Sequence, residues 1–423
     1  MTVQDTLPGI DSPSPPTNGS VRIAPDMRRD LGVFGRNRTR PFHRWYPFVE
    51  GYSAELVERA LAGAAPTGEV MDPFGGSGTT ALAASMLGRD SIFTEVNPYL
   101  AWIAEVKINQ ARTAAATLGA SHDLRNLASA VASGSLPAVE QDHPLLVADS
   151  KRGYFPGNTA QTALELLALV DKSLTGSARE VARLAVATSL VPASQMIRRT
   201  DLRKRISSDP PPVPLRPTVA QRLHDFADDI DRYGSRLVGS TERIAADVRA
   251  PWDRAPNVSV IVTSPPYLNG TNYCRNTKLE LLTLGFMSGE SGLMALRTSS
   301  ISAGINNVSK RRAKAPEIGC VEPIARQLDA VTYDTRIPVL VRTYFADMQQ
   351  VFAQLHRHAV PGARMYFDIG DSRYCGVHVP THSLLRQIAE EQGWRALDEE
   401  VIRTRRSYDG SELTHVLLHF ERP

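Results

Sequence analysis

One stretch near the middle of the chain sets narrow limits on the fold. The apolar run Val260-Ile261-Val262-Thr263 is followed at once by Ser264-Pro265-Pro266-Tyr267. A short run rich in β-branched residues predicts a strand buried in a parallel sheet. Pro265 has no N–H to donate and favours extended backbone at the residue before it, so the strand ends there. The turn is therefore expected at the carboxyl edge of the sheet, where open α/β folds bind their ligands.

This turn presents a hydroxyl, several carbonyls and a flat ring. The ring of Tyr267 can stack on a planar group. The hydroxyl of Ser264 and a nearby carbonyl can accept both hydrogens of an exocyclic amine, which localises the nitrogen lone pair and makes it nucleophilic. Many strands end in a proline turn without any such role, so this motif decides little by itself.

A second motif lies upstream and has the form strand, glycine turn, helix. A strand over 69–72 leads into Pro73-Phe74-Gly75-Gly76-Ser77-Gly78-Thr79-Thr80, and an alanine- and leucine-rich helix follows to about residue 87. Glycines allow close approach of the backbone to a ligand, and the start of a helix offers free N–H groups. No Gly-Lys-Ser/Thr follows, which excludes a Walker A loop, and Asp72-Pro73-Phe74 departs from the usual dinucleotide fingerprint.

Acidic residues end the next two predicted strands. The strand over 91–94 ends at Glu95, a position suited to accepting hydrogen bonds from ribose hydroxyls. The strand over 243–246 ends at Asp247, which is suited to an adenine amine; Asp149 is a rival, but the fourth strand does not follow it directly. A fifth strand is expected over 363–369, and 396–403 with 414–420 form a closing antiparallel pair.

Composition suggests how the chain is divided. We expect a disordered tail rich in Pro, Ser, Thr and Gly at 1–25, a half that carries the glycine turn at 26–110, a mainly helical insertion at 111–235, and a half that carries the Ser-Pro-Pro-Tyr turn at 236–423 with a long loop at 286–340. Two basic runs, Arg198–Arg205 and Lys310–Lys314, are either solvated surface charge or contacts to nucleic-acid phosphates. The cations and aromatic residues at 36–47 have the same two interpretations, and a third is that they line the edge of a cofactor site.

Overall charge and cysteine usage argue against several classes of protein. The 48 basic and 45 acidic residues give a formal net charge of +3, which is too balanced to require a nucleic-acid partner by itself. The three cysteines are scattered and odd in number, which argues against a disulfide framework and against a zinc site. The chain has no apolar run of transmembrane length and no signal-peptide pattern, so a cytoplasmic protein without a membrane partner is expected.

In this order the motifs resemble the S-adenosylmethionine-dependent amino-methyltransferases of DNA, which modify cytosine N4 or adenine N6. The resemblance spans roughly residues 36 to 420 and implies double-stranded DNA as substrate. It also implies an α/β Rossmann-like fold: a seven-stranded, mostly parallel sheet with an antiparallel terminal strand and helical insertions. The implied catalytic residues are Ser264, Pro265, Pro266 and Tyr267. The implied cofactor-binding residues are Asp72, Phe74, Gly75, Gly76, Ser77, Gly78, Thr79, Glu95, Asp247 and Asn276.

The resemblance leaves the choice of base open. Ser264, rather than Asp or Asn, favours cytosine N4, with adenine N6 as the alternative; in either case the base must leave the duplex to react. Methylation of cytosine C5 is disfavoured because it needs a Pro-Cys dipeptide, which the chain does not contain. An RNA or protein-glutamine methyltransferase and a non-catalytic nucleic-acid binder are two further hypotheses. Where the enzyme belongs to a restriction–modification pair, a cognate restriction endonuclease is its partner.

Overall fold

The structure is a computed structural model that describes residues 31–48, 50–65, 67–199, 201–252, 254–268, 274–305, 308, 316–406, 410 and 412–423. The predicted N-terminal tail at 1–25 and the basic run Lys310–Lys314 lie outside these residues. None of the helices in the described part of the chain is both long and apolar enough to cross a membrane.

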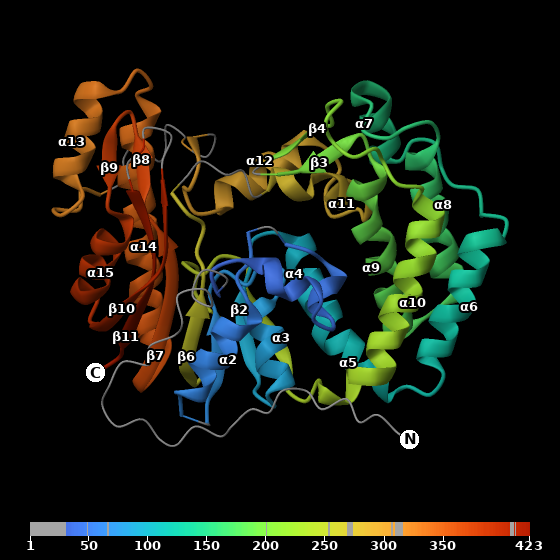
Figure 1. Ribbon diagram of the computed structural model, residues 1–423, viewed down its shortest axis with the longest axis horizontal. Coiled ribbons are helices and arrows are strands. Elements are labelled where there is room, and N and C mark those ends of the chain that lie inside the picture. The colour runs from blue at the N-terminus through green and yellow to red at the C-terminus, as the bar shows by residue number, and fades with distance from the viewer. Residues whose placement is uncertain are drawn as a thin grey trace.

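A seven-stranded sheet forms the centre of the molecule, in the order β10-β11-β7-β6-β1-β2-β5 (Figure 1). Its strands are β1 (Glu69–Asp72), β2 (Ser91–Thr94), β5 (Thr241–Ala245), β6 (Val258–Thr263), β7 (Ala359–Gly370), β10 (Arg395–Arg406) and β11 (Glu412–Glu421). The five strands from β7 to β5 run parallel, and β11 is antiparallel to both of its neighbours. The predicted sheet, with its antiparallel terminal strand, is confirmed.

The strands that end at Asp72 and Thr263 are neighbours in the centre of the sheet. β1 pairs with β6 in parallel, with Met71 opposite Ile261. From β1 the chain proceeds outward through β2 to β5, and then returns across the sheet to β6 and β7. The order therefore reverses between β1 and β6, and such a switch point opens a crevice at the carboxyl ends of the two strands.

Alternation along the central strands builds one apolar layer on each face of the sheet. Val70, Val260 and Val262 pack with apolar side chains of α2 and α3, whereas Met71 and Ile261 pack with those of α14 and α15. Burying each such side chain contributes roughly 1.5 to 3 kcal/mol. The helices of these two layers are α2 (Ala54–Ala62), α3 (Thr79–Met86), α14 (Arg336–His358) and α15 (Thr381–Glu391).

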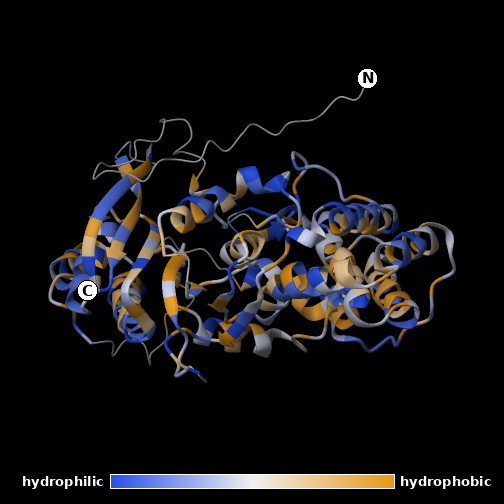
Figure 2. Cartoon of the chain, turned by 90° about the horizontal axis from the view of Figure 1, so that it is seen from below, coloured by the Kyte–Doolittle hydropathy of each residue, from blue (hydrophilic) through white to orange (hydrophobic). Residues whose placement is uncertain are grey.

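The insertion predicted at 111–235 is mostly helical, and we refer to α5–α10 as the helical lobe (Figure 1). Its buried side chains form one continuous core with those of α4 and α11, and Figure 2 shows apolar residues gathered where its helices face one another. The helices concerned are α4 (Pro98–Glu105), α5 (Ala111–Ala116), α6 (Ala120–Ser133), α7 (Pro144–Arg152), α8 (Thr159–Ser173), α9 (Gly176–Ala193), α10 (Leu215–Tyr233) and α11 (Lys278–Thr283); a π-helix, Val106–Gln110, joins α4 to α5.

One buried carboxylate ties the N-terminal segment to this lobe. Asp229 of α10 accepts hydrogen bonds from the backbone N–H of Phe42 (3.1 Å), from the guanidinium of Arg44 (2.7 and 3.0 Å) and from the indole of Trp45 (2.9 Å). Arg40 pairs with Glu58. The basic and aromatic stretch at 36–47 is therefore largely engaged within the protein, which removes Arg40 and Arg44 as free phosphate contacts.

The basic run at 198–205 lies in a hairpin, β3 (Met196–Arg198) and β4 (Leu202–Lys204), whose buried side chains are Met196 and Leu202. One local prediction is wrong. The predicted loop at 286–340 contains α12 (Glu290–Ser299) and α13 (Glu322–Val331) and the start of α14. Polar composition hid α13, because this helix buries little more than Ala325 and Leu328.

Candidate active site

A cavity of about 380 Å³ lies at the carboxyl ends of β1, β2, β5 and β6. This volume is in the range of small-molecule sites. The predicted site residues that line it are Phe74, Gly76, Glu95, Asp247, Ser264, Pro265, Pro266 and Tyr267. The remaining predicted residues are not among those that line it: Asp72, Gly75, Ser77, Gly78, Thr79 and Asn276. The cavity thus brings the glycine turn, both acidic strand ends and the Ser-Pro-Pro-Tyr turn together.

The glycines of the turn have different surroundings. Gly76 has φ +50° and lines the cavity, and a Cβ there would lie 3.1 Å from Cε1 of Phe48. Gly78 has φ +80° and precedes α3, and a Cβ there would lie 2.7 Å from Cβ of Ala104 in α4. Gly76 therefore leaves room at the cavity wall, whereas Gly78 allows two helices to approach each other.

Asp72 stabilises the turn from behind. Its carboxylate accepts hydrogen bonds from Tyr52 Oη (2.8 Å), Thr263 Oγ1 (2.7 Å) and the N–H of Phe74 (3.0 Å). The side chain is buried, and burial raises its pKa to about 6. Asp72 consequently links β1, β6 and the start of the glycine turn, and it does so without facing the cavity.

Glu95 is held by backbone groups at the cavity wall. Its carboxylate accepts hydrogen bonds from the N–H groups of Gly76 (2.9 Å) and Asn97 (2.8 Å). Desolvation raises the pKa of Glu95 to about 7 in spite of these bonds. The carboxylate keeps lone pairs available for donors in the cavity, which is what binding to ribose hydroxyls requires.

Of the two acidic residues considered for the adenine end, only Asp247 lines the cavity. Arg249 donates to both of its oxygens, from Nε (2.9 Å) and Nη2 (2.7 Å), and also pairs with Asp347 of α14 at 2.5 Å. Asp149 lies in α7 and accepts from the N–H of Phe155 (2.8 Å). The geometry therefore favours Asp247 over its rival.

A carboxylate that the sequence interpretation missed also lines the cavity. The amide of Asn276 donates to Oε1 of Glu50 (2.6 Å), so Asn276 orients Glu50 and does not itself reach the cavity. Oε2 of Glu50 is buried without a hydrogen-bond partner among the described residues, and burial raises the pKa of Glu50. An unpartnered carboxylate oxygen at a cavity wall is suited to a cationic group of a ligand. The only signal in the sequence was its position just after the aromatic stretch.

The Ser-Pro-Pro-Tyr turn occupies the other wall. Oγ of Ser264 lies 3.3 Å from the hydroxyl of Tyr267. That hydroxyl donates to Oδ2 of Asp368 (3.0 Å) and lies 2.8 Å from Nε2 of His415. The aromatic ring is thereby fixed by β7 and β11, two strands that the motif itself does not include.

Cys274 also lines the cavity, although it lies beyond the Ser-Pro-Pro-Tyr turn in sequence. Its Sγ is 3.4 Å from Oγ of Ser300, and burial raises the pKa of its thiol. A protonated thiol is a poor nucleophile. The residue therefore gives no support to a cysteine-dependent C5 methylation.

Comparisons with known proteins agree with this geometry. A family described as "DNA methylase", of the N6 and N4 type, matches residues 47–106, which include the glycine turn and Glu95. The type II methyltransferase M.BsoBI of Geobacillus stearothermophilus is 23% identical over 446 residues, covering 92% of this chain and 85% of that protein. M.AvaI of Nostoc sp. is 24% identical over 413 residues, which are 88% of this chain and 83% of that protein. M.MjaII of Methanocaldococcus jannaschii is 34% identical over 86 residues, which is 20% of this chain and 16% of that protein.

The switch-point cavity, the glycine turn and the acidic strand ends fit an S-adenosylmethionine-dependent methyltransferase, and the matches to methyltransferases support this class. Within this class, the matches to the N6 and N4 DNA methylase family and to the type II methyltransferases support a DNA amino-methyltransferase. The residues present fit the cofactor: Gly76 leaves the wall open, and Glu50 offers an unpartnered carboxylate oxygen to its ammonium group. The roles of the individual site residues stay predictions.

Proposed function

We propose that this protein is a site-specific DNA methyltransferase that modifies the N4 amine of a flipped cytosine, as part of a restriction–modification pair or as an orphan enzyme. The observation that carries the proposal is that Ser264, Tyr267, Glu95 and Gly76 line one cavity at the switch point of the sheet. Ser264 at the head of the turn favours cytosine N4; adenine N6 is the alternative.

The cofactor half of the cavity is assigned as follows. Glu95 accepts hydrogen bonds from the ribose, Asp247 accepts from the adenine amine, and Glu50 pairs with the methionine ammonium. Gly76 lets the methionine part lie against the backbone. S-adenosylmethionine supplies a methyl group on a positively charged sulfonium.

The catalytic turn acts on the base. The ring of Tyr267 stacks on the flipped cytosine. Ser264 Oγ and a carbonyl of the turn accept the two amine hydrogens, so that the nitrogen lone pair points at the methyl group. Most of the rate then comes from this positioning. The amine loses its proton late, to Ser264, a carbonyl or water, so no strong base is needed.

The decisive experiment identifies the product. DNA is incubated with the protein and S-adenosylmethionine, and the nucleosides are released and analysed by mass spectrometry. We expect N4-methylcytosine, and a Ser264→Ala/Tyr267→Ala variant serves as the control. N6-methyladenine as the sole product would replace the cytosine proposal with its alternative, and 5-methylcytosine would contradict the assigned chemistry altogether.

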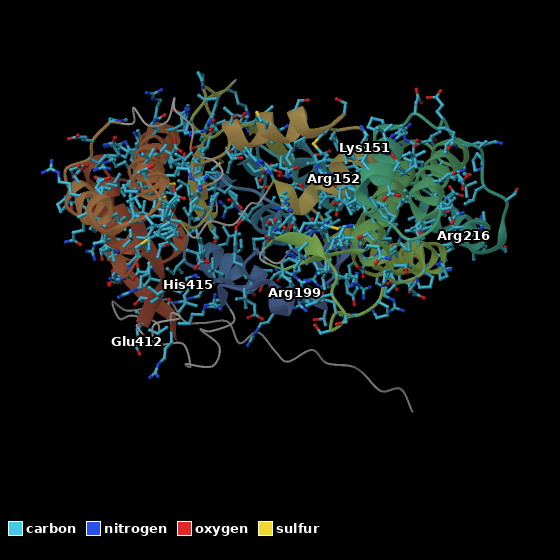
Figure 3. The ribbon with its side chains drawn as sticks, turned by 90° about the horizontal axis from the view of Figure 1, so that it is seen from above. Lys151, Arg152, Arg199, Arg216, Glu412 and His415 are labelled. Atoms are coloured by element: carbon cyan, nitrogen blue, oxygen red, sulfur yellow. The ribbon has the colours of Figure 1, made fainter. Side chains whose placement is uncertain are left out.

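Four cations of the helical lobe form what we call the basic surface: Lys151 and Arg152 at the end of α7, and Arg199 and Lys204 of the hairpin. All four are exposed. Among the residues that the structure describes, the only contact of these cations with a carboxylate is between Arg199 and Asp209, at 3.9 Å. The remaining cations of the run are engaged: Arg198 pairs with buried Glu280, Arg203 with Asp209, and Arg205 donates to the carbonyl of Ser194. In Figure 3, Lys151, Arg152 and Arg199 lie on the lobe, across from His415 on the C-terminal side. We assign this surface to DNA phosphates.

Replacing all four cations of the basic surface with glutamine should weaken DNA binding on every sequence. Each lost phosphate contact should reduce the slope of log affinity against log salt by about 0.9, while affinity for S-adenosylmethionine stays unchanged. Fluorescence anisotropy at several salt concentrations measures DNA binding, and calorimetry measures cofactor affinity. The matched control replaces four exposed cations elsewhere, namely Lys172, Arg232, Arg236 and Arg357. Equal losses in the two sets would mean that only net charge matters.

Cofactor affinity should depend on pH through Glu95. Because desolvation raises the pKa of Glu95 to about 7, its ionised form, the better acceptor for ribose hydroxyls, prevails only above that pH. Affinity should therefore fall as the pH drops through 7, by up to about tenfold per pH unit. Calorimetry measures it, and Glu95→Gln should bind more weakly with a flatter profile. If Glu95→Gln keeps the wild-type profile, another group is titrating.

A further inference from the structure

A chain of hydrogen bonds runs behind the catalytic tyrosine and ends in the cavity. The hydroxyl of Tyr267 donates to Oδ2 of Asp368 (3.0 Å), and Oδ1 of Asp368 lies 2.6 Å from Nε2 of His415. On the other side of the imidazole, Nε of Arg403 donates to Nδ1 of His415 (3.1 Å). Asp368 and His415 are buried, whereas Arg403 lines the cavity beside the catalytic turn.

This chain fixes the tautomer of His415. A guanidinium can only donate, so Nδ1 of His415 must be an acceptor without a proton. The proton of the neutral ring therefore lies on Nε2, where it points to the carboxylate of Asp368. A Cβ at Gly32 would lie 2.6 Å from Cε1 of this imidazole, so close packing also holds the ring in place.

The guanidinium of Arg403 is consequently anchored at one nitrogen and open at two. Among the residues that the structure describes, none forms a hydrogen bond or ion pair with its Nη1 or Nη2. The same Asp368–His415 pair that anchors Arg403 also holds the hydroxyl of Tyr267. The stacking ring and the guanidinium are thereby positioned as one unit, so a base stacked on Tyr267 would present its ring edge to fixed donors.

We propose that Arg403 reads the N3 and O2 edge of the flipped cytosine and is a determinant of base choice; this rests on the proposed cytosine-N4 activity. Cytosine carries two adjacent acceptors, N3 and O2, next to its amine, and two N–H groups of a guanidinium match such a pair. Adenine has N1 next to its amine, but a C–H group follows where cytosine has O2. One donor would then face carbon, and a buried donor left without an acceptor is penalised.

The carboxylate at the far end of the chain offsets the charge of the guanidinium. Methyl transfer moves a positive charge onto N4, and an isolated arginine nearby would oppose it. Asp368, joined to Arg403 through neutral His415, makes the group neutral overall. Arg403 can therefore donate to the base without a net charge working against the reaction.

The test uses the whole protein and duplexes carrying its methylation site, located first in treated DNA. The target position holds either cytosine or 3-deazacytosine, which lacks the N3 acceptor, and single-turnover methylation is measured for wild type, Arg403→Met and Arg406→Met. Arg406 is exposed on the same strand and serves as the matched control. Affinity for S-adenosylmethionine and the midpoint of thermal unfolding confirm that each variant is folded and loaded.

We expect the methylation rate of wild type and of Arg406→Met to be roughly 10- to 100-fold lower on 3-deazacytosine than on cytosine, on the scale of one good bidentate base contact. Arg403→Met should be slower on cytosine by a similar factor and should show little further loss on the analogue. An equal analogue penalty in all three proteins would overturn the proposal. So would a weaker affinity for the cofactor, or a uniform loss of DNA binding, since these assign Arg403 to the cofactor carboxylate or to a phosphate. A product of N6-methyladenine would refute the proposed function itself.

Discussion

Replacing Tyr267 with alanine is expected to reduce the rate of methyl transfer by roughly 10³-fold or more, while affinity for S-adenosylmethionine stays near that of wild type. Loss of base stacking costs about 1 to 3 kcal/mol, and a misplaced nucleophile costs about another 10²-fold. Cofactor affinity should hold because Gly76, Glu95 and Asp247, which we propose bind the cofactor, follow other strands. Single-turnover methylation and calorimetry measure the two quantities separately.

Tyr267→Phe and Ser264→Ala are the matched controls. Tyr267→Phe keeps the stacking ring but removes the hydroxyl that contacts Asp368 and His415, so a loss of about tenfold is expected, on the scale of one hydrogen bond to a charged group. Ser264→Ala keeps the ring and removes one acceptor for the amine, so turnover should fall while cofactor affinity holds. A fully active Tyr267→Ala/Ser264→Ala double variant would show that the chemistry lies on another turn.

The sheet could be predicted because its signals are local. Proline and glycine end the strands at Asp72 and Thr263, and both turns then had to lie at one edge of a parallel sheet. The pairing of Asp72 with Thr263 Oγ1 at 2.7 Å is a consequence of that neighbourhood. The acidic strand ends Glu95 and Asp247 followed from the same rule, and both line the cavity.

The remainder of the site could not be predicted, because it depends on contacts between distant segments. Glu50 is oriented by Asn276, 226 residues further along the chain. Arg403 reaches the cavity only because β10 and β11 close the sheet and His415 anchors its side chain. A run of cations looked uniform in sequence, yet Arg198 is paired with buried Glu280 whereas Lys204 is exposed.

Alanine substitution of Gly78 in the glycine turn is the second change for which we expect a large effect, and Gly76 of the same turn provides the direct comparison. Gly78→Ala is expected to destabilise the protein by roughly 2 to 5 kcal/mol, because a Cβ costs about 1 to 2 kcal/mol in left-handed backbone and overpacks the contact with Ala104 at a cost of about 1 to 3 kcal/mol. The midpoint of urea unfolding measures this loss, which is a large share of the about 5 to 15 kcal/mol that keeps a domain folded.

Gly76→Ala should weaken cofactor binding more than it destabilises the protein. Its Cβ would meet the ring of Phe48 at the cavity wall, at 3.1 Å, and not a packed helix. We therefore expect weaker binding of S-adenosylmethionine with a smaller loss of stability, measured by calorimetry and urea unfolding on the same preparations. The two substitutions therefore distinguish a glycine that the fold needs for helix packing from a glycine that leaves room for the cofactor. A stable Gly78→Ala protein that has lost only cofactor affinity would reverse this assignment and put Gly78, rather than Gly76, against the methionine part of the cofactor.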